Sequence, residues 1–202
     1  MKSSLFAIAL LALSAGCFNQ EPGNVEVILE EKISGEEGKN IKFAIFGAAE
    51  NNGQTSMVII ASDQDDLCGD LGNNPATFID DVIKGEEPGE FVLTTILVDG
   101  ALGNNVRFDG DKQNDQIVDP KFLVGNGAKS LAGAEDKDAE ATLKIDTFDG
   151  TTLVGRIEAN LNQDINALLG GLIGGDLNAP MTVEIFSSTE CAALSDFALS
   201  QL

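Results

Sequence analysis

The chain has 202 residues, of which 43% are hydrophobic and 22% charged, values typical of a folded globular protein rather than a disordered chain. Its formal net charge of −21 at pH 7 repels phosphate backbones, which argues against nucleic-acid binding. The sequence holds no His, Trp or Tyr, and this excludes His-based catalytic relays, His-ligated metals and the usual stacking platforms for sugars and bases.

Residues 1–16 are typical of a secretory signal peptide. Lys2 supplies a short positive region, residues 5–13 form an uninterrupted apolar run, and three small residues follow. The apolar run is about half of the ~20 residues that a membrane-spanning helix needs. We therefore expect this leader to be removed rather than to span a membrane.

The leader ends at a cysteine. Residues 13–17 (LSAGC) resemble the lipobox of bacterial lipoproteins, in which the Cys, here Cys17, is alkylated by diacylglycerol before cleavage in front of it; Ser14 stands where the family prefers Leu. The alternative is an ordinary signal peptide that ends beside a Cys. Each buried methylene contributes about 0.8 kcal/mol, so two or three acyl chains give a firm membrane anchor. Residues 17–24 would then be the lipidated Cys and a short tether.

The residue after the Cys bears on localisation. By resemblance to the enterobacterial sorting pattern, Phe18 in place of Asp implies the outer membrane, facing either the periplasm or the cell surface.

Two cysteines remain in the body, Cys68 and Cys191. An even pair in an oxidising compartment usually forms a disulfide. A catalytic Cys is the competing interpretation, but the chain offers it no His partner. A bond that spans most of the body favours one β-rich domain over residues 25–202.

Alternation of apolar and polar residues predicts strands along most of the body. The expected strands are residues 25–29, 41–46, 56–60, 91–98, 106–108, 122–124, 141–147, 152–158 and 181–186. Asp149-Gly150 between two alternating runs predicts a hairpin. Short strands separated by turn residues predict a mainly β fold, an antiparallel sandwich or barrel-like structure of about eight strands with one or two short helices.

Two short helices are expected. Ser62 is placed to cap one over residues 63–71, and residues 187–190 (SSTE) form a capping-box pattern ahead of a C-terminal helix over 191–202. Both body cysteines then lie at strand-to-helix transitions. A disulfide there would hold the two helices against one end of the sheets.

The segment 165–173 has apolar residues at helical spacing within a glycine-rich stretch. Four glycines, each costing up to about 1 kcal/mol relative to Ala, disfavour an isolated helix. We expect the segment to close one end of the core. The alternative is a mobile apolar flap that contacts lipid or a small ligand.

Asp109, Asp111 and Asp115 resemble the start of a calcium loop, because alternating oxygen ligands suit a hard cation. Their loop departs from the EF-hand pattern, with Asn114 at the sixth position and Pro120 at the twelfth. A solvated acidic face is the alternative in so acidic a chain. No residue pattern supplies a nucleophile, a base or a nucleotide-binding loop, so we expect no catalytic residues and no cofactor other than Ca²⁺.

The order of these features resembles a group of uncharacterised bacterial lipoproteins with two body cysteines. The resemblance rests on residues 57–68 and on the hairpin, strand and final Cys within residues 143–191. It implies a secreted β-sandwich with one disulfide and brings no activity with it. The glycine-rich insertion and the C-terminal helix lie outside the pattern.

The sequence thus favours a non-enzymatic, lipid-anchored β-domain that contacts another envelope protein, cell-wall material or cations. A carrier of an apolar ligand, with residues 165–173 as its flap, is the first alternative. A calcium-binding surface module is another, and a hydrolase that uses only carboxylates has the least support.

Overall fold

A computed structural model describes residues 24–29, 40–72, 74–84, 86–109, 115–124, 129–131, 141–164 and 176–202. The described strands are β1 (Asn24–Leu29), β2 (Phe43–Asn51), β3 (Gln54–Ser62), β4 (Glu90–Asp99), β5 (Val106–Asp109), β6 (Asp115–Val124), β7 (Lys129–Leu131), β8 (Ala141–Phe148), β9 (Thr152–Asp164) and β10 (Asp176–Glu190). The described helices are α1 (Leu67–Leu71), α2 (Pro75–Lys84) and α4 (Ala192–Leu199).

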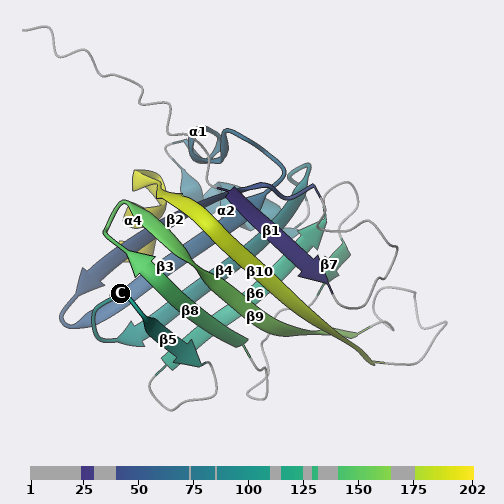
Figure 1. Cartoon of the computed structure of the whole chain (residues 1–202). Coiled ribbons are helices and arrows are strands. Elements are labelled where there is room, and N and C mark those ends of the chain that lie inside the picture. Colours follow the sequence, from purple (N-terminus) through teal and green to yellow (C-terminus); the bar gives the residue numbers. More distant parts are fainter. Residues whose placement is uncertain are drawn as a thin grey trace, which may run out of the picture.

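The strands form one ten-stranded mixed sheet in the order β5-β8-β9-β10-β2-β3-β4-β6-β7, with β1 paired to β10. Strand β10 joins the two halves of the sheet. One edge of β10 pairs with β9 along most of its length, and the other pairs with β1 over residues 181–187 and then, in parallel, with β2 over residues 189–190. The sheet curls at this junction, so that β1, β10, β9, β8 and β5 lie in front of β2, β3, β4, β6 and β7 (Figure 1).

The inner face of the curled sheet holds one apolar core. Side chains from both halves meet there, and all of the following are buried: Ile41, Ala44, Phe46, Met57, Ile59, Ala61, Val92, Ile96, Leu143, Ile145, Leu153, Ile157, Val183 and Ile185. Alternate residues of β2, β3 and β4 face the opposite way, because successive side chains of a strand point to opposite faces. These residues form a second core under the three helices.

The helices cover the outer face of β2, β3 and β4 (Figure 1). Helix α4 lies directly on β2, and an added Cβ at Gly47 would sit 2.1 Å from the backbone carbonyl carbon of Leu194. Ser195 of α4 accepts a hydrogen bond from the Ala48 amide and donates one to the Glu190 carboxylate at 2.8 Å. The only residue that can stand at position 47 without moving α4 is therefore glycine.

The mainly β class, the C-terminal helix and the nine expected strands are confirmed, with shifted ends. A sandwich of about eight strands is not confirmed, because β10 carries one continuous sheet from the front half to the back half. The Asp149-Gly150 hairpin is confirmed, and Gly150 has the positive φ of +90° that the turn requires.

Two helix predictions need correction, and one helix was not predicted. Helix α1 begins at Leu67 rather than at residue 63, because the Ser62 hydroxyl accepts a hydrogen bond from the Gln64 amide within a bend. Residues 187–190 are the end of β10, so the capping box is wrong and Cys191 occupies the N-cap position of α4. Helix α2 was not expected, because Asn74-Pro75 resembles a turn; here the proline is the first helical residue.

Candidate functional sites on the curled sheet

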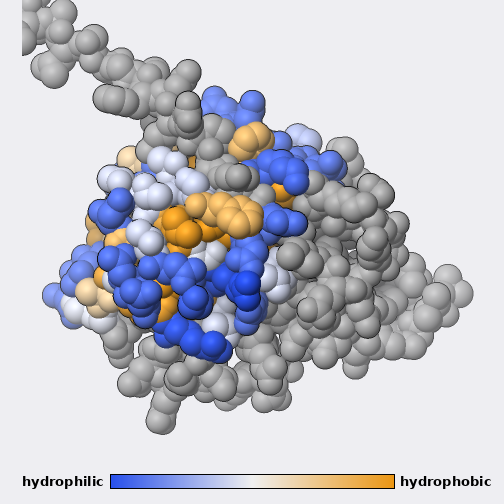
Figure 2. Space-filling view, viewed as in Figure 1, coloured by the Kyte–Doolittle hydropathy of each residue, from blue (hydrophilic) through white to orange (hydrophobic). Residues whose placement is uncertain are grey.

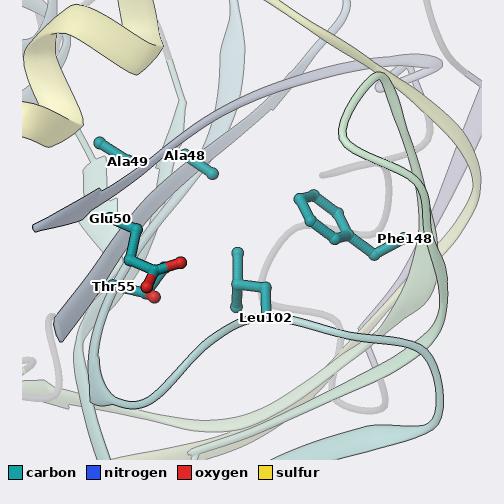
Figure 3. Close-up of a pocket in the computed structure, with 6 residues that line it drawn as sticks. All are labelled: Ala48, Ala49, Glu50, Thr55, Leu102 and Phe148. Atoms are coloured by element: carbon teal, nitrogen blue, oxygen red, sulfur yellow. The ribbon is translucent and has the colours of Figure 1, made fainter. Parts of the chain in front are cut away.

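A pocket of about 170 Å³ opens at one end of the inner face, and we name it the end pocket. Its lining residues are Ala48, Ala49, Glu50, Thr55, Leu102 and Phe148 (Figure 3). They come from three places: the β2–β3 hairpin, the connection after β4, and the end of β8. Along β2, Phe46, Ala48 and Glu50 share one face, so the buried core runs without a break into the pocket.

Specific hydrogen bonds hold the pocket walls. The Thr55 hydroxyl donates to the Gly100 carbonyl, and the Gly100 amide donates to the Gly53 carbonyl at 2.8 Å. The Phe148 amide donates to the side-chain oxygen of Asn104 at 2.6 Å. These bonds tie the connection that carries Leu102 to the hairpins on either side of it. The walls are therefore preformed.

Phe148 is fixed by an aromatic contact as well. Its ring packs edge-to-face on the buried ring of Phe46, with the centroids 5.9 Å apart. Among the described residues that line the pocket, Glu50 is the only charged one. The end pocket therefore combines apolar walls with a single carboxylate at its rim.

The turn that follows Phe148 is held by Asp149. Its carboxylate accepts hydrogen bonds from the Thr151 amide, the Thr152 amide and the Thr151 hydroxyl at 2.9, 2.7 and 2.9 Å. These donors favour the charged form and lower the pKa of Asp149 below its ordinary value, the Thr151 amide contributing most.

We expect the stability supplied by Asp149 to be complete above pH 3.8, the ordinary pKa of the group, and to be lost as the pH falls through the lower folded value. The free energies of unfolding of the wild-type protein and Asp149→Ala, measured between neutral pH and pH values well below 3.8, should therefore converge on acidification. A constant difference across that range would contradict the role assigned to this carboxylate.

The outer face of β5, β8, β9 and β10 carries a second feature, a polar depression of about 270 Å³. Its lining residues are Arg107, Thr142, Lys144, Asp146, Arg156, Glu158 and Glu184. The coloured atoms over β8 and β9 in Figure 2 are mainly hydrophilic. Both arginines of this acidic chain lie in the depression.

Register explains how the basic residues come together. Arg107 is opposite Lys144, Lys144 is opposite Arg156, and Arg156 is opposite Glu184. Arg156 donates hydrogen bonds to Glu184 and, at 3.2 Å, to Glu158. Both raise its pKa, Glu184 more strongly.

Lys144 Nζ lies 2.6 Å from the Asp146 carboxylate, which offsets the repulsion between neighbouring cations. Among the described residues, three basic and three acidic side chains line the depression, so their formal charges cancel. The depression contains a cross-strand ion-pair network in which Lys144 and Arg156 already have carboxylate partners.

The predicted site residues have different outcomes. Cys68 and Cys191 form the expected disulfide, with their Cα atoms 5.7 Å apart. Cys17 and residues 165–173 lie outside the described residues.

Of the predicted calcium ligands, Asp109 ends β5, Asp115 begins β6, and Asp111 lies outside the described residues. Within the part of the chain that the structure describes, no three His, Cys, Asp or Glu side chains are grouped so as to hold a metal ion. The calcium site therefore stays a prediction.

The end pocket is not predicted by any pattern in the sequence. Glu50 and Phe148 each precede a turn that the sequence marks, at Asn52-Gly53 and at Asp149-Gly150. Nothing in the sequence indicates that the two turns lie at the same end of the sheet, because that depends on the strand order.

No helix among the described residues is long and apolar enough to cross a membrane. No protein-family model matches this chain, and neither a curated protein nor a solved structure is significantly similar to it, so its function has to be argued from its own residues.

Proposed function

We propose that this chain is a lipoprotein of the bacterial outer membrane whose β-domain acts by binding rather than by catalysis. The disulfide between Cys68 and Cys191 carries the proposal, because such bonds persist in exported proteins and are rare in the cytosol. It uses both body cysteines. Cys17, at the end of a secretory leader, is then the one cysteine left for attachment of lipid.

The end pocket supports a binding role. It brings one carboxylate to apolar walls, whereas hydrolysis by carboxylates needs two facing acids. Its walls are held by hydrogen bonds and by the contact between Phe148 and Phe46, so a ligand meets a preformed surface. The net charge of −21 favours a cationic partner among envelope proteins or cell-wall material.

Lipidation is tested by mass spectrometry of the protein purified from a bacterium that processes lipoproteins. We expect a first residue of Cys17 that carries diacylglycerol, and we expect Cys17→Ser to lose both the lipid and membrane association. Ser14→Leu, which restores the residue that the lipobox prefers, is the matched control and should still be lipidated. A bare Cys17 thiol, or an uncleaved leader in the wild type, would overturn the proposal.

The outer-membrane assignment has its own test. If Phe18 permits transport to the outer membrane, Phe18→Asp should leave the protein in the inner membrane after the two membranes are separated on a density gradient. An unchanged distribution would contradict this localisation while leaving lipidation intact.

A further inference from the structure

The end pocket presents a carboxylate without a basic partner. Figure 3 shows the Glu50 carboxylate turned toward Leu102, with the Phe148 ring on the opposite wall. None of the ion pairs within the described residues involves Glu50. Glu50 is an exposed residue beside apolar side chains, and in a protein this acidic a carboxylate without a basic partner attracts cations.

A second acceptor lies next to Glu50. Thr55 is directly opposite Glu50 in the β2–β3 register, and its hydroxyl hydrogen is used by the Gly100 carbonyl. The Thr55 oxygen therefore keeps a lone pair for an incoming donor. A primary ammonium group has three N–H donors and can bond the carboxylate and this oxygen together.

The other walls suit an aliphatic chain. Ala48, Leu102 and Phe148 are half-buried and pack against the inner core. The volume of about 170 Å³ is below the roughly 300–1,000 Å³ of sites for drug-sized ligands, so the pocket admits one group the size of a side chain.

We infer that the end pocket binds an aliphatic primary ammonium group, with its methylenes against Ala48, Leu102 and Phe148 and its nitrogen at Glu50 and Thr55. The group is the end of a lysine side chain or of a free alkyl amine, since both present this chemistry. The inference rests on the proposed binding role and gives that role a site.

Other ligand classes fit less well. An anion would be repelled by the Glu50 carboxylate and by the net negative charge of the whole chain. A neutral apolar group gains nothing from the Glu50 carboxylate, which is exposed to water at the rim of the pocket. A calcium ion takes six to eight oxygen ligands, more than the pocket supplies.

The test uses the protein as the cell processes it, observed by amide NMR at Thr55, Gly100 and Leu102. The probes are Nα-acetyl-lysine N-methylamide and pentylammonium, each compared with its uncharged counterpart, Nα-acetyl-norleucine N-methylamide and pentanol. Each ammonium should bind about tenfold more tightly than its counterpart, the usual effect of one charge-assisted hydrogen bond. The tighter of the two ammonium probes identifies the source.

Variants assign the effect to this pocket. Glu50→Gln should weaken ammonium binding about tenfold. Phe148→Leu, which offers the methylenes a smaller apolar wall, should weaken it about threefold. Glu86→Gln is the matched control, because this exposed carboxylate lies near the start of β4, whereas the pocket is at the other end of that strand. It should bind as the wild type does.

The inference is overturned if Glu50→Gln binds as tightly as Glu86→Gln, or if charged and uncharged probes bind equally. This inference and the proposed function fail in different ways. A lipidated protein that binds no ammonium would contradict only the ammonium site. A protein with a bare Cys17 thiol that binds ammonium would contradict only the assignment to the envelope.

Discussion

Gly47→Ala is expected to lower the free energy of unfolding by about 3 kcal/mol or more, the upper part of the range for overpacked core positions. The added methyl would lie 2.1 Å from the Leu194 carbonyl carbon and 2.3 Å from the Ser195 amide nitrogen. Both are backbone atoms, so no change of rotamer relieves the clash. Helix α4 has to move away from β2, and the hydrogen bond from the Ala48 amide to Ser195 is lost with it.

Gly103→Ala is the matched control for this prediction. Its added Cβ would meet nothing closer than Val106 Cγ2 at 3.6 Å, an ordinary contact. Urea denaturation should place Gly103→Ala within about 0.5 kcal/mol of the wild type, as for most unstrained surface changes. Amide hydrogen exchange at Ala48 should accelerate in Gly47→Ala alone. Equal stability of the two variants would contradict the close approach of α4 to β2.

Removal of the disulfide is expected to cost about 2–5 kcal/mol. The bond joins residues separated by 123 positions, and the chain-entropy account gives about 5 kcal/mol as the ceiling for a loop of that length. Cys68 belongs to α1 and Cys191 precedes α4, so the bond also keeps both helices on the outer face of β2 and β3. We expect Cys68→Ala/Cys191→Ala to unfold at a markedly lower urea concentration.

The single variants sharpen this test. Cys68→Ala and Cys191→Ala each break the same bond, so the loss in the double variant should be close to that in either single variant rather than to their sum. Reduced wild-type protein provides a control that leaves both sulfur atoms in place. Additive losses, or a reduced protein as stable as the oxidised one, would contradict the contribution assigned to the cross-link.

Local patterns predicted the strands well, because a strand with one face in a core alternates apolar and polar residues. In β8 and β9 this alternation and the Asp149-Gly150 turn sufficed to predict a hairpin in the correct place. The two disulfide partners also followed from counting, since only Cys68 and Cys191 remained in the body. The hairpin depends on residues that are neighbours in the sequence, and the disulfide on the one possible pairing of two cysteines.

The arrangement of strands was beyond local patterns. Strand β10 lies between β9 and β2 because of packing between residues far apart in the chain, and the same packing brings Phe148 to Glu50. Helix α2 was missed for a related reason, since Pro75 breaks a helix in its interior but begins one at its first position. The sequence alone does not show that Phe78 and Val82 of this helix are buried, because they pack in the core formed with the sheet beneath them.

The position of β10 sets the order of events when the chain matures. Residues 176–190 supply the strand that connects both halves of the sheet, although all the other described strands precede them in the chain. Until these residues have left the ribosome, neither half has its shared edge, and long-range pairing of this kind slows folding. The inner core, to which Val183 and Ile185 of β10 contribute, can therefore be completed only after the last strand has been synthesised.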